Sequence, residues 1–512
     1  MSIIKKSSVI HPFLFAVFPI FFMFSYNVEF MELSELVTPL MVSIIPTFLL
    51  WQLLSFLLKD KKKAGLIVSF FIIIFFSYGH IYNELQYIRI WNIKIVKSKY
   101  LLTANGLLLS LAIYFILRVR NSFSDFTYIL NVISSLLVII SITSIFYGIS
   151  TREDVFSKDQ VESSISGEVL NGPDIYYIIL DQYGREDVLK QMYNYDNAPF
   201  LNYLKQKGFY IANNGSCNYC STKLSLSSSL NMMYLDGIAK QVGENSMDFR
   251  PLKNLISNNK VVNFLKKKGY SYYSYSSGYS FTEVTNSDVY LTKPGLLSEF
   301  HNILISTTII PVLLKKIVNQ YDLHRERLIF IFNSLIQIAK DKSPKFVFAH
   351  IISPHPPFVF GKNGEPIKSD RPFFFRRDKN LMNKADAEDY IEKYKNQLIY
   401  LNRKMIEVID LIIANSAAPP IILLQADHGP AAYYDRKSLK NSNLKERMSI
   451  LNAYYFPKKE YNKLYNSISP VNSFRIIFNQ YFNTNYTLLK DKNYFSSCIS
   501  SYKFINVTPD IN

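Results

Sequence analysis

Cysteine is scarce in this sequence, which has only Cys217, Cys220 and Cys498 among its 512 residues. Three cysteines cannot form the set of bridges that stabilises a disulfide-rich domain. Cys217 and Cys220 could pair with each other in an oxidising compartment, or they could remain free. A structural zinc site would need a second pair of ligands, and the sequence offers none nearby. We therefore expect neither a disulfide framework nor a cysteine-based zinc site.

The sequence also lacks a nucleic-acid-binding motif, although its formal net charge is +17. Basic residues beside apolar runs are ordinary signals of membrane topology, and positive charge favours proximity to anionic lipids. There is no internal repeat, and the only low-complexity tract is the serine-rich run 225–229. We expect a membrane partner and no nucleic acid.

Long apolar runs are confined to the first 150 residues. A membrane-spanning helix needs about 20 residues, and we predict five, at 10–26, 37–58, 64–82, 100–118 and 127–149. The first run could be a signal peptide, because Lys5 and Lys6 precede it, but no small-residue cleavage pattern follows. The sequence therefore predicts a multi-pass membrane domain at 1–149, in the inner (plasma) membrane.

The basic loops predict the orientation of this domain. Lys5 and Lys6 precede the first run, the cluster 59–63 separates the second from the third, and Arg118 and Arg120 follow the fourth. Loops rich in Lys and Arg face the cytoplasm. The basic loop 89–99 argues against this arrangement, and a six-span or re-entrant arrangement would reverse it. With five spans, residues from 150 onward lie outside the cytoplasm.

The rest of the chain has a different residue pattern. A polar linker is predicted at 150–172 and a catalytic domain at 173–512. Apolar runs and helical spacing alternate in this domain, which predicts a largely parallel sheet covered by helices on both faces. The predicted strands are 174–180, 209–212, 270–275, 345–351 and 420–425, and the predicted helices are 199–208, 224–235, 261–268, 328–340 and 390–414.

Acidic residues stand at the ends of two predicted strands. Asp181 follows one strand, and Asp427 and His428 follow another. Either Asp alone could be a turn or cap residue. Ligands bind beyond the carboxyl ends of the strands in open α/β sheets, and hard oxygens with an imidazole suit Mn, Zn or Mg. We predict one divalent metal ion there, with Mn²⁺ favoured over Zn²⁺ and Mg²⁺.

Thr222 is the candidate nucleophile. It stands at the start of a predicted helix, where it could also be the N-cap. Backbone N–H groups and the helix dipole at such a position suit a phosphate or sulfate. A hydroxyl needs a base or a metal to become a strong nucleophile, and Asp181, Asp427 and His428 could hold that metal.

His355 lies in a Pro-His-Pro-Pro loop directly after a predicted strand, which restricts its motion. We predict that it is an acid or a charge stabiliser for the leaving group. His350, inside the strand, is expected to make a structural hydrogen bond. Lys223 and Arg185 could assist an anionic substrate, but solvated positions are expected for both.

These motifs give the chain a family resemblance. Ile-Leu-Asp181, Thr222-x-x-Ser225 with Asn231 later in the helix, Ser-Pro-His355 and Ala-Asp427-His428-Gly resemble the sulfatase-like branch of the alkaline phosphatase superfamily. The resemblance is greatest to the membrane-bound lipoteichoic acid synthases and phosphoethanolamine transferases. It covers about 340 residues from Pro173 and implies an α/β/α sandwich. Relatives also carry about five N-terminal helices.

The resemblance implies roles for single residues. Asp181, Thr222, Asp427 and His428 would bind one catalytic metal, with Thr222 as nucleophile, and His355 would contact the substrate. Gln182 stands where many relatives carry a second acid, which favours one metal over two. The motif around Cys220 lacks the Pro and Arg that accompany formylglycine formation in true sulfatases. No motif locates a substrate-binding arginine.

Three functions are compatible with these patterns. The first is a transferase that moves a phosphoryl-linked head group, of phosphoglycerol or phosphoethanolamine type, from a membrane phospholipid donor to a surface glycan or lipid acceptor. The second is a sulfatase or phosphodiesterase hydrolase, which shares the first half-reaction. The third is a non-catalytic domain, against which the complete set Asp181, Thr222, His355, Asp427 and His428 argues.

Overall fold

The computed structural model describes residues 8–28, 31–85, 89–90, 93–94, 98–120, 122–150, 172–313, 319–367, 373 and 384–511. The chain divides into two compact units. One comprises Met1–Gln160 with Leu297–Asn319, and the other comprises Val161–Leu296 with Gln320–Asn512. Residues 151–171 of the predicted linker lie outside the described residues.

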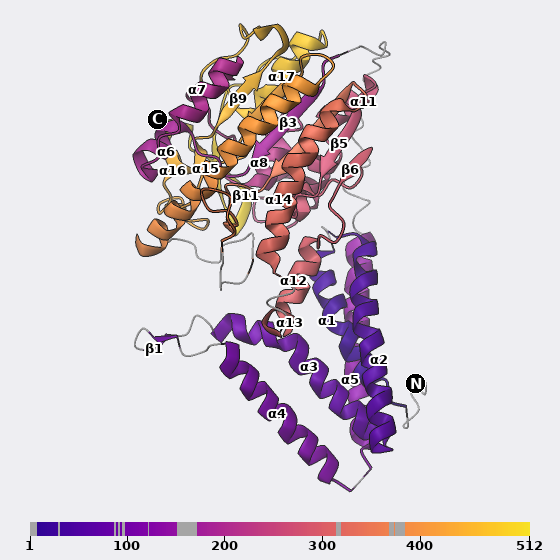
Figure 1. Cartoon of the computed structure of the whole chain (residues 1–512). Helices are drawn as coiled ribbons and strands as arrows, with labels where there is room; N and C mark the ends of the chain where they lie inside the picture. The colour runs from indigo at the N-terminus through magenta and orange to yellow at the C-terminus, as the bar shows by residue number, and fades with distance from the viewer. Residues whose placement is uncertain are drawn as a thin grey trace. The chain divides into compact units, whose positions relative to one another are not determined.

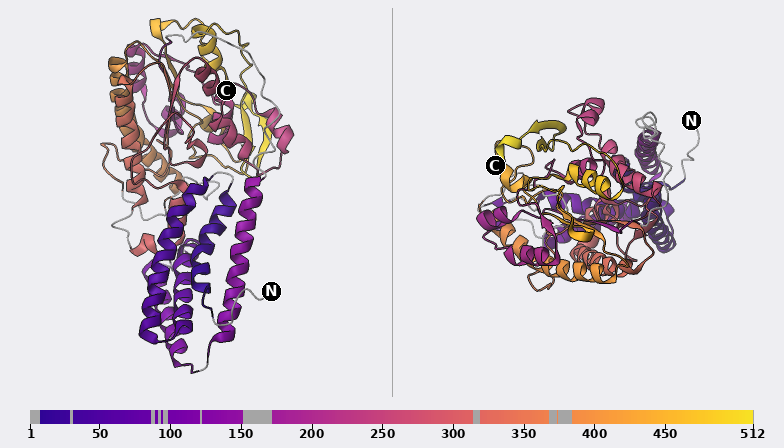
Figure 2. Two further views of the ribbon diagram at one scale, coloured as in Figure 1. Left: turned by 90° about the vertical axis from the view of Figure 1, so that its right-hand side faces the viewer. Right: turned by 90° about the horizontal axis from the view of Figure 1, so that it is seen from above.

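The first unit contains long apolar helices near the predicted positions. α1 packs against α2, α3 and α5, and α4 packs against α3 (Figures 1 and 2). A 3₁₀ turn at Leu33–Leu36 leads into α2. Two antiparallel strands of two residues each, β1 and β2, precede α4. The bounds are α1 His11–Asn27, α2 Val37–Leu58, α3 Lys61–Leu85, β1 Arg89–Ile90, β2 Ile93–Lys94, α4 Ser98–Arg118 and α5 Ser124–Ser150.

Four helices in the described part of the chain are long and apolar enough to cross a membrane. These are Leu33–Leu58, Lys61–Tyr82, Tyr100–Arg118 and Ser124–Ser150. α1 is a shorter apolar helix of 17 residues with Pro19 inside it. The prediction of an N-terminal domain of apolar helices is confirmed. The fifth span, at α1, stays a prediction.

Residues 297–319 belong to the first unit, although the sequence places them within the predicted catalytic domain. They form α12 (Glu299–Thr307) and α13 (Ile310–Leu313). α12 packs against α3 and α1, and α12 and α13 lie beside these helices in Figure 1. The apolar run is short and is interrupted by Ser306, Thr307 and Thr308, so its length does not mark it as a membrane segment.

The second unit is built around a seven-stranded sheet of order β4-β9-β8-β3-β7-β5-β6. β3 lies between β7 and β8 and pairs in parallel with both, and only β9 is antiparallel to this central set. The prediction of a largely parallel sheet is confirmed. The strands are β3 Ile175–Leu180, β4 Tyr210–Ile211, β5 Ser271–Tyr275, β6 Val289–Leu291, β7 Lys345–Ile351, β8 Ile421–Gln425 and β9 Asn452–Tyr455.

Helices cover both faces of this sheet (Figure 1). β3 is buried along its whole length, so both of its faces need apolar cover. Tyr177 faces α8 and α17, where it hydrogen-bonds Ser229 and packs on Phe474. α14 and α15 pack against each other and contribute to the main apolar core. The principal helices are α7 Ala198–Lys207, α8 Thr222–Ser229, α11 Lys260–Lys267, α14 Gln320–Gln337, α15 Lys384–Asn415 and α17 Pro470–Tyr481.

The predicted bounds of the helix at 224–235 were wrong at both ends. α8 begins at Thr222 and stops at Ser229, and Met232 then adopts a left-handed conformation with φ of 54°. The Asn231 side chain explains the stop, because its amide donates to the carbonyls of Ser227 and Leu255 and competes with the helical backbone. Asn231 is therefore outside the helix in which the sequence placed it.

Several short elements were not predicted. Most are amphipathic helices of one or two turns, too short for periodicity to identify, and the last two strands form a separate hairpin. They are α6 Glu186–Tyr193, α9 Asp236–Val242, α10 Arg250–Ser257, α16 Leu444–Met448, β10 Tyr494–Ser497 and β11 Ser500–Asn506. The strands β6 and β9 and the helix α17, given above, were also not predicted.

Candidate active site

Three polar side chains meet at the carboxyl ends of the central strands. Asp181 directly follows β3, Asp427 follows β8 by two residues, and His350 is the penultimate residue of β7. β3 is flanked by the other two strands, with Ile179 opposite His350 in the register. The carboxyl ends of parallel neighbours share one sheet edge, which brings the three residues together.

Asp181, His350 and Asp427 can each offer one ligand atom, and these atoms lie within 4.8 Å of one another. All three residues are buried. The sequence predicted a structural hydrogen bond for His350, and its Nδ1 does pair with the Thr282 hydroxyl at 2.8 Å. Its Nε2, however, lies 3.4 Å from Asp181 Oδ2. His350 is thus a candidate ligand that sequence reasoning missed.

The cluster contains buried polar atoms without hydrogen-bond partners. They are Asp181 Oδ1, Asp427 Oδ2 and His350 Nε2. Burial raises the pKa of both Asp181 and Asp427, and the Asp181 carboxylate raises that of Asp427 further. Two buried carboxylates without a cation are unfavourable, and their oxygens together with an imidazole are a normal donor set for a divalent ion. The residues present therefore fit a metal site.

His428 adds a second imidazole at the edge of this cluster. Its Nε2 lies 3.2 Å from Asp427 Oδ2 and 4.0 Å from Asp181 Oδ1. Its Nδ1 donates to the Gly429 carbonyl at 3.2 Å, so the neutral ring carries its lone pair on Nε2. Burial, followed by the charge of Arg447, holds the pKa of His428 well below its usual value. A carbonyl-oriented neutral imidazole is a common form of a metal ligand.

Thr222 is the first residue of α8, and its Oγ1 lies 3.1 Å from His428 Nε2. Because that nitrogen carries the lone pair, the threonine hydroxyl donates to it. The N-cap position belongs to Ser221, which makes no side-chain capping bond. Thr222 is therefore not the capping residue, and its hydroxyl faces the candidate metal ligands.

Arg447 is a further residue beside the cluster that the sequence analysis did not identify. It lies in α16, with Nη2 3.1 Å from His428 Nε2. Its Nε donates to the Cys220 carbonyl and its Nη1 to the Gly429 carbonyl, each at 2.9 Å. These bonds join the segment before Thr222 to the segment after His428. Only the folded chain reveals this contact, because α16 has no distinctive pattern.

His355 lies next to Asp181 but outside the group Asp181, His350 and Asp427. Its backbone N–H donates to the Asp181 carbonyl at 3.1 Å, and its Nδ1 donates to the Pro356 carbonyl. Burial lowers the pKa of His355, whereas the Asp181 carboxylate acts in the opposite direction. The imidazole is therefore held beside the cluster, next to the Asp181 carboxylate.

Other residues considered from the sequence make local contacts. The Gln182 side chain accepts a hydrogen bond from Tyr390 OH of α15 at 2.8 Å. In the sequence comparison above, this is the position where many relatives carry a second acid. Lys223 places its ammonium over the Phe249 ring, and Arg185 pairs with Asp187 at 2.7 Å. Neither basic residue is fully solvated. All three cysteines of the chain are free, which answers the open question about Cys217 and Cys220.

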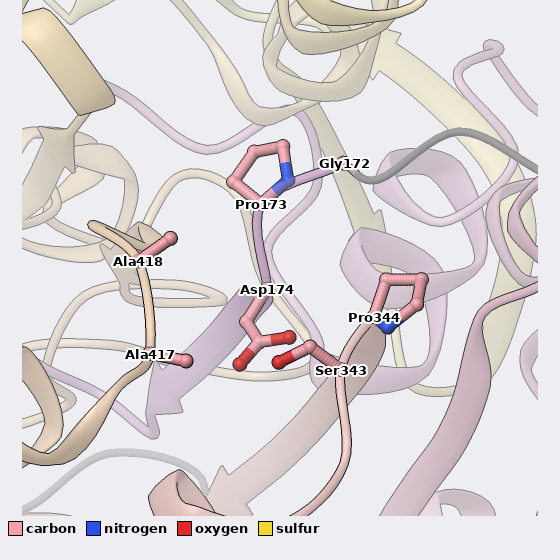
Figure 3. Close-up of a pocket in the computed structure, with 7 residues that line it drawn as sticks. All are labelled: Gly172, Pro173, Asp174, Ser343, Pro344, Ala417 and Ala418. Atoms are coloured by element: carbon pink, nitrogen blue, oxygen red, sulfur yellow. The ribbon is translucent and has the colours of Figure 1, made fainter.

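A pocket of about 220 Å³ lies at the opposite edge of the sheet (Figure 3). Its lining residues precede β3, β7 and β8, whereas the candidate metal ligands stand at the carboxyl ends of the same strands. Asp174 in this pocket forms a buried ion pair with Lys345 at 2.6 Å. The pocket is therefore separate from the candidate active site. It is lined by Gly172, Pro173, Asp174, Ser343, Pro344, Ala417 and Ala418.

Comparison with known proteins identifies the family. The family described as Sulfatase matches residues 173–473, and the chain belongs to that family. The predicted membership in the sulfatase-like branch of the alkaline phosphatase superfamily is confirmed, as is the prediction of a sulfatase-like phosphotransferase or hydrolase. No curated protein matches the chain by sequence.

Solved structures with a similar fold include transferases and sulfatases. The C-terminal periplasmic domain of EptC from Escherichia coli, in complex with Zn, is 12% identical and covers 66% of this chain and 93% of its own, with a TM-score of 0.44. The soluble domain of lipooligosaccharide phosphoethanolamine transferase A from Neisseria meningitidis is 12% identical, with coverages of 61% and 89% and a TM-score of 0.37. A 2-O GAG sulfatase is 12% identical, with coverages of 64% and 73% and a TM-score of 0.41. At these values the likenesses carry no argument about substrate.

Proposed function

We propose that this protein is a membrane-anchored, metal-dependent transferase. It moves a phosphoryl-linked head group, of phosphoglycerol or phosphoethanolamine type, from a membrane phospholipid to a surface glycan or lipid through a covalent intermediate on Thr222. The observation that carries the proposal is the Thr222 hydroxyl, 3.1 Å from His428 Nε2 at the edge of a buried Asp-His-Asp cluster. A chain attached to the bilayer by apolar helices is suited to a lipid donor.

In the first half-reaction, Thr222 Oγ forms a bond to phosphorus and the bond from phosphorus to the lipid oxygen breaks. The hydroxyl proton leaves toward the ligand cluster, where the Asp427 carboxylate can accept it. A bound divalent metal lowers the pKa of a coordinated hydroxyl and stabilises negative charge on phosphoryl oxygens. Asp181, His350, Asp427 and His428 would hold this metal, and the donor set favours Mn²⁺, with Zn²⁺ and Mg²⁺ as alternatives.

His355 is the proposed partner of the leaving group. Its place beside Asp181 and its restricted loop would let it stabilise the lipid oxygen as the bond to phosphorus breaks. Because Nδ1 donates to the Pro356 carbonyl, the group that donates to the leaving oxygen is Nε2–H of the protonated ring. Arg447 is a positioning residue, because it fixes the backbone on both sides of the Thr222–His428 contact. Its charge also helps to keep His428 neutral.

The second half-reaction decides between transfer and hydrolysis. An acceptor hydroxyl that attacks phosphorus and releases Thr222 completes a transfer, whereas water at the same position makes the enzyme a hydrolase. Sulfatase or phosphodiesterase activity is therefore the alternative function.

Head-group-labelled phospholipid vesicles test this proposal. Purified full-length protein with Mn²⁺ should retain label on the chain and release little free head group when no acceptor is added. Thr222→Ala should retain no label, and Ser221→Ala is the matched control because it removes the neighbouring hydroxyl. Rapid release of free head group without acceptor would support hydrolysis instead.

The proposed location places the catalytic domain outside the cytoplasm. Protease added to intact spheroplasts should cut within residues 150–172 and release a large fragment. Cleavage only after lysis would refute this orientation without bearing on the chemistry of the site.

A further inference from the structure

The start of α12 is attached to the loop between α1 and α2. Ser298, the N-cap of α12, hydrogen-bonds the Glu35 carboxylate through its hydroxyl. His301 Nε2 donates to the Glu35 carbonyl at 3.2 Å, and Phe300 packs edge-on against Phe24 near the end of α1. The start of α12 therefore lies level with the ends of the neighbouring apolar helices.

The other end of α12 lies deeper along α3. The Ile309 backbone N–H donates to the Phe75 carbonyl at 3.1 Å. Phe75 precedes Tyr82, the last residue of the apolar span Lys61–Tyr82, by seven residues. At about 1.5 Å per residue, Ile309 meets α3 roughly 10 Å inside that end of the span.

Glycine allows this close approach. A Cβ at Gly79 would lie 2.1 Å from the Ser306 carbonyl oxygen and 2.6 Å from the Thr307 carbonyl carbon. Small residues at such contacts are typical of helix packing within membranes.

We infer that residues 298–313 are a membrane-embedded element that enters the lipid bilayer beside α3, with phospholipid acyl chains as its partner. The inference takes from the proposed function only that α3 spans a membrane. The polar side chains fit an apolar surrounding, because the hydroxyls of Ser306, Thr307 and Thr308 donate to helix carbonyls at 2.6–2.7 Å. Leu313 at the end of α13 is 59% exposed and would face the acyl chains.

Fluorescence quenching by lipid tests this inference. Cys498 is replaced by Ser, since Cys217 and Cys220 are buried, and one cysteine is introduced by Leu313→Cys in the full-length protein. An NBD label at this position, in vesicles containing acyl-chain doxyl lipid, should be strongly quenched. Leu111→Cys on α4 and Met247→Cys in the second unit are matched controls, because both residues are 56% exposed.

Three outcomes are distinguishable. Quenching at positions 313 and 111 but not at 247 supports the embedded element. Quenching at 111 alone overturns it and leaves the membrane domain intact. Absence of quenching at both 313 and 111 overturns the inference and the membrane anchoring of the proposed function, without bearing on the chemistry at Thr222. Label incorporation and thermal unfolding of each variant establish that the three proteins are equally folded.

Discussion

Replacement of Gly79 by Ala should destabilise the first unit, although Ala is the better helix former. The new Cβ would lie 2.1–2.7 Å from backbone atoms of Ser306 and Thr307. Because backbone cannot rotate away as a flexible side chain can, α12 must shift by about 1 Å to restore ordinary contacts of 3.4 Å or more. Such overpacking typically costs about 1–3 kcal/mol, against a gain of about 0.5–1 kcal/mol from helix propensity.

The assay is thermal unfolding of full-length protein in vesicles, with Gly106→Ala as the matched control. Gly106 lies in α4, another apolar helix, and a Cβ there would meet no atom within 4 Å. We expect Gly79→Ala to unfold at a lower temperature than the parent protein and Gly106→Ala to be equal or more stable. Equal stability of the two variants would refute the close contact between α3 and α12.

Four further predictions concern the active site. Thr222→Ala should lose catalysis by on the order of 10⁶ in kcat but cost only about 1 kcal/mol of stability, since it loses one hydrogen bond and no cap; activity assays and unfolding curves on one preparation check this. The metal bound per protein, measured by elemental analysis, should be lower in each of the variants Asp181→Asn, His350→Ala, Asp427→Asn and His428→Ala. Full metal stoichiometry in any one variant would remove that residue from the site. His355→Ala should lower kcat by about 10²–10⁴ with metal content unchanged; lost metal would move His355 among the ligands, and normal kcat would remove it from the site. Burial raises the pKa of Asp427 from 3.8 to about 7, so the metal-free protein loses stability as the pH rises through this range and the buried Asp427 carboxyl loses its proton. The Tm increase on adding Mn²⁺ should therefore grow up to about pH 7 and then level off. An increase that is larger at pH 5 than at pH 7.5 would contradict this.

Local patterns were enough to predict the central strands and the residues that follow them. Asp181 directly follows one apolar run, and Asp427 and His428 follow another within three residues of its end, and both runs are strands of the central sheet. Such runs are buried on both faces, so their boundaries are sharp in the sequence. Thr222 was predicted at a helix start for a different reason, the Thr- and Ser-rich segment around it, and the helix it begins is shorter than predicted.

His350 and Arg447 could not be predicted as members of the site. His350 is inside a strand, where alternation alone does not show that its Nε2 points toward the end of the neighbouring strand. Arg447 lies in a five-residue helix with no sequence signature. The place of α12 in the first unit was likewise missed, because the contact with α3 depends on Gly79, more than 200 residues away in sequence.

The most direct test of the central claim is the mass of the peptide that carries Thr222. Full-length protein would be acid-quenched during turnover with Mn²⁺ and phospholipid vesicles, then digested and analysed by tandem mass spectrometry. The account predicts the added mass of one phosphoryl-linked head group on Thr222, and no such mass when a chelator has removed the metal. Added mass on Ser221 or Ser225, or continued turnover with no added mass on any of these residues, would contradict it.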